Sequence, residues 1–374
     1  MWFFRSPSII YGEESISYLN DISQKRIVIL TDKNIAGAGL VQKIKSQLPE
    51  DANVLIIDNV PVEPTLSYVS SIKGQISKFY PDLIIGLGGG SCMDCAKAAF
   101  VTYERPDMDM HDITPLVTLD LRKKSKIILI PTTSGTGSEC SWAAVISDDD
   151  HGRKNELASP EIIADFAILD PVMVSSLPDA VRKSTAIDAL AHAIEARSST
   201  WKNIYSDIFA DKAIELITGN LMEALRNHED LEAVSNVHIG ASMAGLAFSN
   251  SQITLAHALG HSLGAHFKIP HGVSVGIFLP HVIRFNYSSA DKEYSMLNKK
   301  FPTSMRKRYL YLTVENFLKQ LSMPLTISDL NIRRSEYEKK IDSMVSLALE
   351  STGTVLNPKD VGRTELEMLL KEIE

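Results

Sequence analysis

The sequence predicts an α/β domain followed by an all-helical domain. Short β-branched runs alternate with helical patterns in the first half, one run ends in glycines, and only helical periodicity continues after Pro178. Short apolar strands that alternate with helices are typical of a parallel sheet covered on both faces. Because 374 residues suffice for two ordinary domains, we expect one domain at residues 1–177 and a second at 178–374. The boundary falls in the segment 170–179.

The predicted elements can be placed along the chain from their periodicity. The first half holds predicted strands at residues 26–32, 53–60, 82–90 and 126–132. Helical patterns separate these strands, at residues 33–48, 65–79 and 92–104. The second half holds predicted helices at residues 179–199, 203–225, 231–249, 253–267, 308–321 and 337–351, and a charged terminal helix at 359–374.

Composition limits the classes of protein to consider. Hydrophobic residues make up 44% and charged residues 22%, a mix that can bury a large core. A net charge of −8 without a basic patch argues against nucleic acid and anionic membranes as partners. We expect neither a signal peptide nor a membrane helix, because no apolar run approaches about 18 residues. Three cysteines are typical of a reducing compartment, so we expect a cytoplasmic protein.

Histidines gather in one stretch of the second half. Residues 255–286 hold five of the ten histidines, and His257 and His261 are spaced to share one face of a helix. Asp188 and His192 repeat this spacing upstream, and His271 begins another apolar segment. One metal site could be built from Asp188, His192, His257 and His271, and imidazoles with one carboxylate suit Fe²⁺ or Zn²⁺. The alternative is a set of ordinary core histidines.

A glycine-rich turn follows the third predicted strand. Gly86, Gly88, Gly89 and Gly90 precede Ser91 at a strand-to-helix junction, where backbone N–H groups can meet a pyrophosphate. The spelling is not GxGxxG, so a simple tight turn is the alternative. A second loop of small residues, 131–139, follows the fourth strand. Both loops should lie at the carboxyl edge of the sheet, which favours a dinucleotide site.

Asp32 ends the first predicted strand and has two interpretations. Its carboxylate could hold the ribose hydroxyls of NAD and repel the 2′-phosphate of NADP, or it could be a turn residue. Cys92 and Cys95 form a CxxC at the start of a helix. We interpret them as small helix residues, because redox CxxC sites do not normally share a turn with a phosphate loop.

Four segments together resemble the iron-containing (group III) alcohol dehydrogenases. They are GGGSCMDCAK (88–97), PTTSGTGSE (131–139), LPDAVRKSTAIDALAHAIEA (177–196) and AHALGHSLGAHFKIPHGVSVGIFLPH (256–281). The resemblance covers essentially the whole chain. It implies an α/β nucleotide-binding domain followed by a helical metal domain, with the active site between them.

The resemblance also implies roles for individual residues. The metal ligands would be Asp188, His192, His257 and His271, with His261 beside the metal. The pyrophosphate loop would comprise Gly89, Gly90, Ser91 and Asp94. Further cofactor contacts would come from Thr132, Thr133, Thr136 and Lys154. Asp32 matches the position whose acidic residue accompanies NAD rather than NADP.

By resemblance, the protein would be a metal-dependent alcohol dehydrogenase or aldehyde reductase. Hydride would pass between a small alcohol and NAD(H), with Fe²⁺ in the site and Zn²⁺ as the alternative ion. His261 would relay a proton or orient a ligand. The expected assembly is a homodimer or a larger homo-oligomer. Other readings are a zinc-dependent glycerol or glycerol-phosphate dehydrogenase, a dehydroquinate-synthase-like enzyme, and a non-catalytic dinucleotide sensor.

Two positions depart from the family pattern. Ala186 stands where the motif before the first ligand usually has glycine, and Lys359 stands where the family usually has arginine after Asn-Pro. We expect Ala186 to leave the ligand in place. The lysine leaves the role of that arginine open.

Overall fold

The computed structural model describes residues 3–150 and 153–374. The chain divides into two compact units, Met1–Leu177 and Pro178–Glu374. Across the described ranges, no helix has both the length and the apolar character that a bilayer crossing requires.

The N-terminal unit is built on a parallel sheet. Within residues 3–150 and 153–177, the sheet has six strands in the order β1-β8-β5-β4-β2-β3, each parallel to its neighbours. The strands are β1 (Ser8–Tyr11), β2 (Arg26–Leu30), β3 (Asn53–Ile57), β4 (Leu83–Gly88), β5 (Lys126–Pro131) and β8 (Phe166–Leu169).

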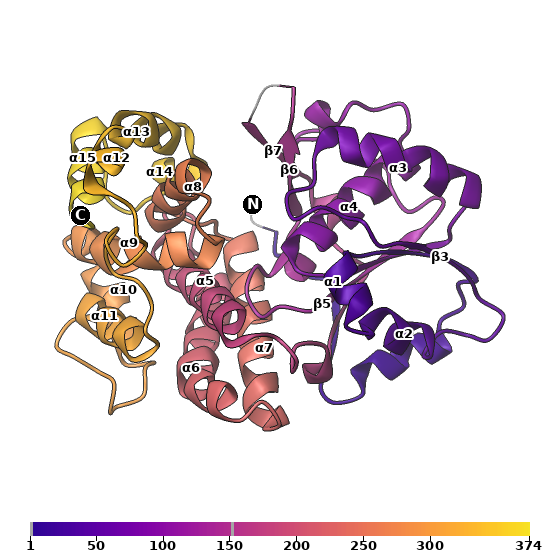
Figure 1. Cartoon of the computed structure of the whole chain (residues 1–374), viewed down its shortest axis with the longest axis horizontal. Coiled ribbons are helices and arrows are strands. Elements are labelled where there is room, and N and C mark those ends of the chain that lie inside the picture. The colour runs from indigo at the N-terminus through magenta and orange to yellow at the C-terminus, as the bar shows by residue number, and fades with distance from the viewer. Residues whose placement is uncertain (1–2, 151–152) are drawn as a thin grey trace. The chain divides into compact units, whose positions relative to one another are not determined.

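Helices cover both faces of this sheet, as Figure 1 shows. Alternate residues of β2 point to opposite faces: Val28 and Leu30 pack with α3 (Leu66–Phe79) and α4 (Gly90–Glu104), whereas Ile27 and Ile29 pack with α2 (Leu40–Lys45). Both faces are buried, which explains why the strands read as continuous apolar runs.

The connections that leave β2 and β4 run in opposite directions across the sheet, toward β3 and toward β5. From β2 the chain passes through α1 (Lys33–Gly37) and α2 on one face to β3, and it later leaves β4 through α4 on the other face. The carboxyl ends of β2 and β4 therefore form a topological switch point, the usual place for a ligand in an open α/β sheet. Asp32 follows β2 and Gly89 follows β4.

The predicted helix at 33–48 is broken in the structure. It forms α1 and α2, separated where Gly39 adopts φ 78°, a left-handed conformation that interrupts a helix. Strands β1 and β8 have only four residues each, too short to stand out by periodicity. A hairpin of β6 (Ala143–Asp148) and β7 (Arg153–Ala158) was also missed, because RKNELA in β7 is too polar to read as a strand.

The C-terminal unit is helical throughout its described length. The helices around the candidate site are α5 (Asp179–Ser198), α7 (Leu231–Ser249), α8 (Leu255–Phe267) and α9 (His271–Asn286). The remaining helices are α6 (Ile204–Arg226), α10 (Asp291–Asn298), α11 (Leu310–Gln320), α12 (Arg334–Glu338), α13 (Ile341–Glu350), α14 (Thr352–Val355) and α15 (Arg363–Lys371). A parallel-sheet unit followed by a helical unit confirms the predicted fold class.

Candidate metal centre

Three helices of the C-terminal unit supply the candidate metal ligands. Asp188 and His192 lie one turn apart on α5, His257 lies in the first turn of α8, and His271 is the first residue of α9. Pro270 precedes α9, so the helix begins at this histidine. Sequence spacing could place Asp188 with His192, but only the packing of the helices brings α8 and α9 to them.

Glycines allow the close approach of these helices. A Cβ on Gly272 would lie 1.9 Å from the carbonyl oxygen of Ser184 on α5, and one on Gly260 would lie 2.9 Å from the backbone nitrogen of Val275 on α9. These distances leave no space for a side chain at either position. Helix α9 can therefore lie directly against α5 and α8, which carries His271 to the other ligands.

The donor atoms converge on the carboxylate of Asp188. Its Oδ1 lies 3.5 Å from Nε2 of His257 and 3.2 Å from Nε2 of His271, and its Oδ2 lies 4.0 Å from Nδ1 of His192. Asp188, His192 and His257 are buried, and their ligating atoms lie within 4.8 Å of one another. The His271 side chain is 41% exposed, so it forms the open side of the cluster.

The cluster has the chemistry of a metal site rather than of a satisfied core. Oδ1 of Asp188 and Nε2 of His257 are buried, and neither makes a hydrogen bond within the described residues. Buried polar atoms are normally paired, and unpaired ones indicate a missing partner. Imidazoles with one carboxylate fit Fe²⁺ or Zn²⁺, and a site with an open side is typical of catalysis.

Charge in the cluster also favours a cation. Burial alone would raise the pKa of Asp188, but the neighbouring His271 and His192 hold it well below its usual range. Burial alone would lower the pKa of His257, but the carboxylates of Glu195 and Asp188 raise it to about 9. The metal-free cluster thus keeps an ionised carboxylate beside a cationic imidazole, and a metal would displace that proton.

His261 lies beside the cluster, as predicted from its spacing with His257. Its ring stacks on that of His271 at a centroid distance of 4.9 Å and meets the ring of His257 edge-on at 5.9 Å. Phe248, which comes from α7, stacks on His192 at 4.3 Å. Aromatic contacts therefore fix the imidazole planes around the cluster.

Glu195 is a site residue that sequence reasoning missed. It is 1% exposed, and its Oε2 makes a hydrogen bond with Nδ1 of His257. The signal was present, because Glu195 follows Asp188 and His192 on the same face of α5 at helical spacing. No rule of spacing, however, would have assigned it to a histidine of another helix.

The N-terminal unit carries the glycine turn at the end of β4. Gly88 has φ 150°, Gly89 is the N-cap of α4, and Gly90 begins that helix. A Cβ on Gly90 would lie 2.9 Å from Cγ2 of Thr136, so the second loop packs directly on the turn. The N–H groups of the first turn of α4 have no partner within the helix and suit a phosphate.

The second loop places hydroxyl groups beside this turn. The backbone N–H of Thr132 donates to the carbonyl of Gly88 at 3.0 Å. Oγ1 of Thr132 and Oγ1 of Thr133 are buried without a hydrogen-bond partner among the described residues. Oγ1 of Thr136, in contrast, accepts from the N–H of Ser138 at 3.3 Å. Two unpaired hydroxyls thus lie in the loop beside the glycine turn.

Two other predicted cofactor residues, Asp94 and Ser91, form hydrogen bonds within the protein. Asp94 accepts from Oγ of Ser138 at 2.5 Å and from the N–H of Val145 at 3.0 Å. Ser91 donates to the carbonyl of Val62. Lys154 is exposed on β7, opposite Ser147 of β6.

Lys97, one turn after Asp94, is fully buried and fastens the same loop. Its Nζ donates to Oγ of Ser138 and Oγ of Ser141, both at 3.0 Å, and to the carbonyl of Ala143 at 2.7 Å. Asp94 and Lys97 together tie α4 to the second loop and to β6.

Asp32 is the N-cap of α1, a position compatible with its interpretation as a turn residue. Oδ1 accepts from the N–H groups of Asn34 at 2.7 Å and Ile35 at 3.0 Å, and Oδ2 lies 3.6 Å from Sγ of Cys92. Burial raises the pKa of Cys92 and raises that of Cys95 to about 12. Both cysteines are therefore neutral buried thiols, in agreement with their interpretation as small helix residues.

The two departures from the family pattern have structural explanations. Ala186 is fully buried on α5 and leaves Asp188 in the cluster. The ammonium of Lys359 lies 3.9 Å from the ring centre of Phe285, and it donates to the carbonyl of that residue at 3.3 Å. Asn357 and Asn286 exchange hydrogen bonds at 2.7 and 2.8 Å. The Asn-Pro-Lys segment is thus a packing element.

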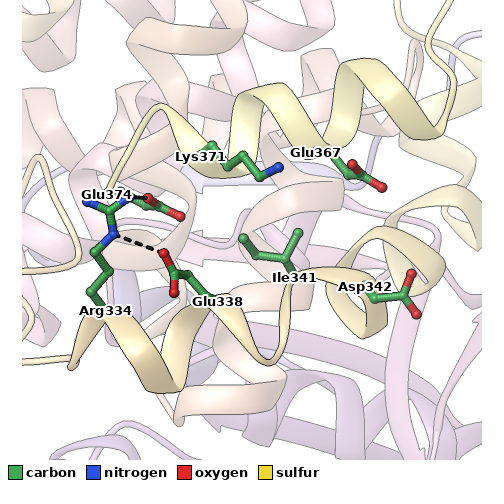
Figure 2. A pocket seen from close by; sticks show the side chains of 7 residues that line it. All are labelled: Arg334, Glu338, Ile341, Asp342, Glu367, Lys371 and Glu374. Atoms are coloured by element: carbon green, nitrogen blue, oxygen red, sulfur yellow. Dashed lines mark hydrogen bonds and ion pairs between the residues drawn. The ribbon is translucent and has the colours of Figure 1, made fainter.

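A separate hollow lies among α12, α13 and α15 of the same unit. Arg334 bridges Glu338 at 3.0 Å and Glu374 at 2.6 Å across it, as Figure 2 shows. Because these carboxylates are neutralised by the arginine, the hollow lacks the concentration of unpaired polar atoms found around Asp188.

Both units of the chain match models of known protein families. Residues 6–171 match the family described as iron-containing alcohol dehydrogenase, and residues 183–373 match the family described as Fe-containing alcohol dehydrogenase, C-terminal. The chain belongs to the iron-containing alcohol dehydrogenase family. The resemblance inferred from the four motifs is confirmed, and with it an oxidoreductase that acts on alcohols.

Individual members of this family extend over the full chain. An alcohol dehydrogenase of Thermococcus barophilus is 34% identical over 381 residues, covering 99% of this chain and 98% of its own. An NADPH-dependent butanol dehydrogenase of Clostridium saccharobutylicum is 31% identical, covering 99% and 97%. A 1-propanol dehydrogenase of Citrobacter freundii is 32% identical, covering 97% and 96%. Because these relatives are alcohol, butanol and 1-propanol dehydrogenases, the comparison does not favour the alternative interpretation as a glycerol dehydrogenase.

Solved structures of the family share the fold. The iron-containing alcohol dehydrogenase of Thermococcus thioreducens superposes with a TM-score of 0.90 at 29% identity, covering 100% of this chain and 99% of its own. A 1,3-propanediol oxidoreductase superposes with a TM-score of 0.92 at 25% identity, covering 100% of both chains.

Proposed function

We propose that this member of the iron-containing alcohol dehydrogenase family interconverts small alcohols and aldehydes with NAD(H) and a divalent metal. The observation that carries the proposal is the cluster of Asp188, His192 and His257, whose ligating atoms lie within 4.8 Å of one another. His271 completes it from α9. We assign these four residues as ligands of Fe²⁺, with Zn²⁺ as the alternative ion.

When bound, the metal supplies Lewis acidity toward the substrate oxygen and the dinucleotide accepts or donates the hydride. The protein's share is position and charge. Asp188 keeps one negative charge in a buried position, and the histidine rings are held by stacking. The exposed edge at His271 leaves the side from which a substrate can enter.

His261 is proposed as the proton relay between substrate and solvent. It is partly exposed and stacks on the half-exposed ring of His271. An imidazole can take up and release a proton near neutral pH. The competing role is orientation of the His271 ring, and it predicts that mutation of His261 also removes the metal.

The dinucleotide is proposed to bind at the switch point of the N-terminal sheet. Gly89, Gly90 and Ser91 would offer backbone N–H groups to the pyrophosphate, and Thr132 and Thr133 would offer their unpaired hydroxyls. Because both carboxylate oxygens of Asp94 are bonded within the protein, it would act by holding the second loop. Thr136 would do the same by packing on Gly90, whereas Lys154 would have to reach the cofactor from β7.

Asp32 is proposed to favour NAD(H) over NADP(H). Its Oδ1 is used by the helix cap, so Oδ2, which accepts one long hydrogen bond from Sγ of Cys92 at 3.6 Å, would take a ribose hydroxyl. A 2′-phosphate at the same place would meet a like charge. The butanol dehydrogenase of Clostridium saccharobutylicum is NADPH-dependent, so this preference has to be measured for each member.

Relatives that act on butanol and 1-propanol suggest short primary alcohols as substrates.

We further propose a homodimer or larger assembly, because β1 is an edge strand of the sheet and an edge is a template for a second copy. All three cysteines are free thiols, which suits a reducing cytoplasm. Light scattering after size-exclusion chromatography would give the mass of the assembly and so test the proposed homo-oligomer.

The test is an assay of metal-stripped protein reloaded with Fe²⁺ under argon or with Zn²⁺. NADH oxidation is followed with propanal, butanal, dihydroxyacetone and a no-substrate blank. We expect turnover with the linear aldehydes only after metal is restored. Activity that is unchanged by stripping, or turnover confined to dihydroxyacetone, would overturn the proposal.

A further inference from the structure

Glu195 is a buried carboxylate to which the proposed chemistry assigns no task. It lies on α5 with Asp188 and His192, and its side chain is 2% exposed. A carboxylate in such a position is costly unless each oxygen is bonded. The residues that bond it identify what it does.

Both oxygens of Glu195 accept hydrogen bonds from the first turn of α8 and from the residue that precedes this helix. Oε1 accepts from Oγ1 of Thr254 at 2.8 Å and from the backbone N–H of Ala256 at 2.6 Å. Oε2 bonds Nδ1 of His257. Thr254 is the N-cap of α8 but gives no side-chain cap, so Glu195 takes that task from another helix. The N–H of Ala256 can only donate, which fixes the orientation of the carboxylate.

This orientation decides the tautomer of His257. An ionised carboxylate accepts hydrogen bonds and cannot donate them, so Nδ1 of His257 must carry the hydrogen. In the neutral ring, Nε2 then holds the lone pair. Nε2 is the atom that lies 3.5 Å from Oδ1 of Asp188, on the side of the metal cluster.

We propose that Glu195 is a positioning residue, which holds His257 in the tautomer and ring orientation that metal binding requires. Carboxylates that bond the far nitrogen of a metal-bound histidine act in this way in other sites. The inference rests on the proposed function, since it presupposes a metal at His257. The same carboxylate caps α8, so one side chain links the start of that helix to the ligand two residues further on.

Glu195→Gln tests the proposal with little change of shape. The N–H of Ala256 still needs an acceptor, so the amide oxygen takes the place of Oε1 and the amide NH₂ faces His257. Nδ1 must then accept, and the ring hydrogen moves to Nε2, where it blocks the metal. We expect metal affinity to fall roughly 10–100-fold in a competition titration with a chromogenic chelator.

Glu104→Gln is the matched control. Glu104 is also buried and accepts from the backbone N–H groups of Lys123, Lys124 and Ser125, in the N-terminal unit. We expect this variant to melt at a lower temperature with unchanged metal affinity. In a double-mutant cycle, Glu195→Gln should add nothing to the loss caused by His257→Ala, because Glu195 acts through that ring.

Two outcomes would overturn the inference. One is a folded Glu195→Gln protein that binds metal as tightly as the wild type. The other needs no variant: ¹⁵N NMR of zinc-loaded wild-type protein must find the hydrogen of His257 on Nδ1, and a hydrogen on Nε2 refutes the proposal even if the variant fails to fold. If wild-type protein binds no metal at all, the proposed function fails instead.

Discussion

Nε2 of His271 lies 3.2 Å from Oδ1 of Asp188, although one residue begins α9 and the other lies in the middle of α5. The contact joins an exposed imidazole to a buried carboxylate. His271 is therefore the candidate ligand most easily removed without disturbing the core.

His271→Ala should reduce metal affinity by more than the roughly 10–100-fold typical of an outer-sphere partner. One of four ligands is lost, and Asp188 keeps its charge with one fewer neutralising neighbour. Metal content after dialysis and a chelator titration give the measurement. His281→Ala is the control, because His281 pairs with Glu372 at 3.0 Å and makes no contact with Asp188 within the described residues. Equal metal content in both variants would contradict the assignment.

Gly272→Ala should disturb the same cluster through the backbone. The new Cβ would lie 1.9 Å from the carbonyl oxygen of Ser184, so α9 must move away from α5. Overpacking of this kind typically costs about 1–3 kcal/mol of unfolding free energy, measured by urea denaturation. Metal affinity should fall with it, since His271 moves with the helix.

Gly219→Ala is the matched control for that variant. Gly219 is exposed on α6, and an added Cβ would have no atom of another element within 4 Å. Alanine there should stabilise the protein by roughly 0.5–1 kcal/mol and leave metal affinity unchanged. A Gly272→Ala protein as stable as wild type would mean that the α5–α9 contact is looser than described.

Part of the cluster was predictable, because two of its candidate ligands have the spacing of one helical turn. Asp188 and His192 lie one turn apart, and few other histidines compete with them. Glu195 has the same local signature but was not predicted, because its partner His257 belongs to another helix. That partnership depends on the crossing of α5 with α8, which no periodicity encodes.

The cofactor loop shows the same limit. The glycine turn was predicted correctly at the end of a strand, but Asp94 was expected at the pyrophosphate, and its oxygens are bonded to Ser138 and to Val145. Val145 belongs to the β6–β7 hairpin, which the polar sequence of β7 concealed. One of the two hydrogen bonds of Asp94 therefore depends on a strand that was not predicted.

His261→Gln should separate proton relay from ligand orientation. If His261 relays a proton, the variant should keep its metal and cofactor while turnover falls by about 10²–10⁴-fold, the usual contribution of general acid–base catalysis. If it instead orients His271, on which it stacks at 4.9 Å, metal should be lost as well. Metal analysis and steady-state kinetics on one preparation decide. Full metal with a normal rate would remove His261 from both roles.

His238 should make stability depend on pH. It is 2% exposed on α7, and burial lowers its pKa to about 4, whereas an unfolded histidine titrates near ~6.5. Between these values the unfolded chain binds more protons, so the free energy of unfolding rises with pH. The stabilisation is complete above pH ~6.5 and is lost on acidification toward pH 4, by about 3 kcal/mol in all.

His238→Gln removes that titration. Urea denaturation of metal-free protein at several pH values in this window should give a smaller slope for the variant than for the wild type. Other groups contribute equally to both proteins, so the difference reports His238. Parallel slopes would show that His238 has the same pKa in the native and the unfolded protein, which would contradict the predicted effect of burial.

Asp32 combines a helix cap with the proposed choice of cofactor. Asp32→Asn keeps an oxygen that can accept from the N–H groups of Asn34 and Ile35, but it removes the charge. The Asp32→Asn protein should therefore be as stable as the wild type. The ratio of kcat/KM for NADH to that for NADPH should fall, chiefly because the KM for NADPH becomes lower. Asp32→Gly removes cap and charge together. Because glycine is itself tolerated at an N-cap, the free energy of unfolding of the Asp32→Gly protein should fall by only a few tenths of a kcal/mol. Ratios of kcat/KM for the two cofactors, measured beside the urea midpoints, separate the two roles. If wild type used NADPH as well as NADH, or if Asp32→Asn left the ratio unchanged, Asp32 would be a capping residue alone.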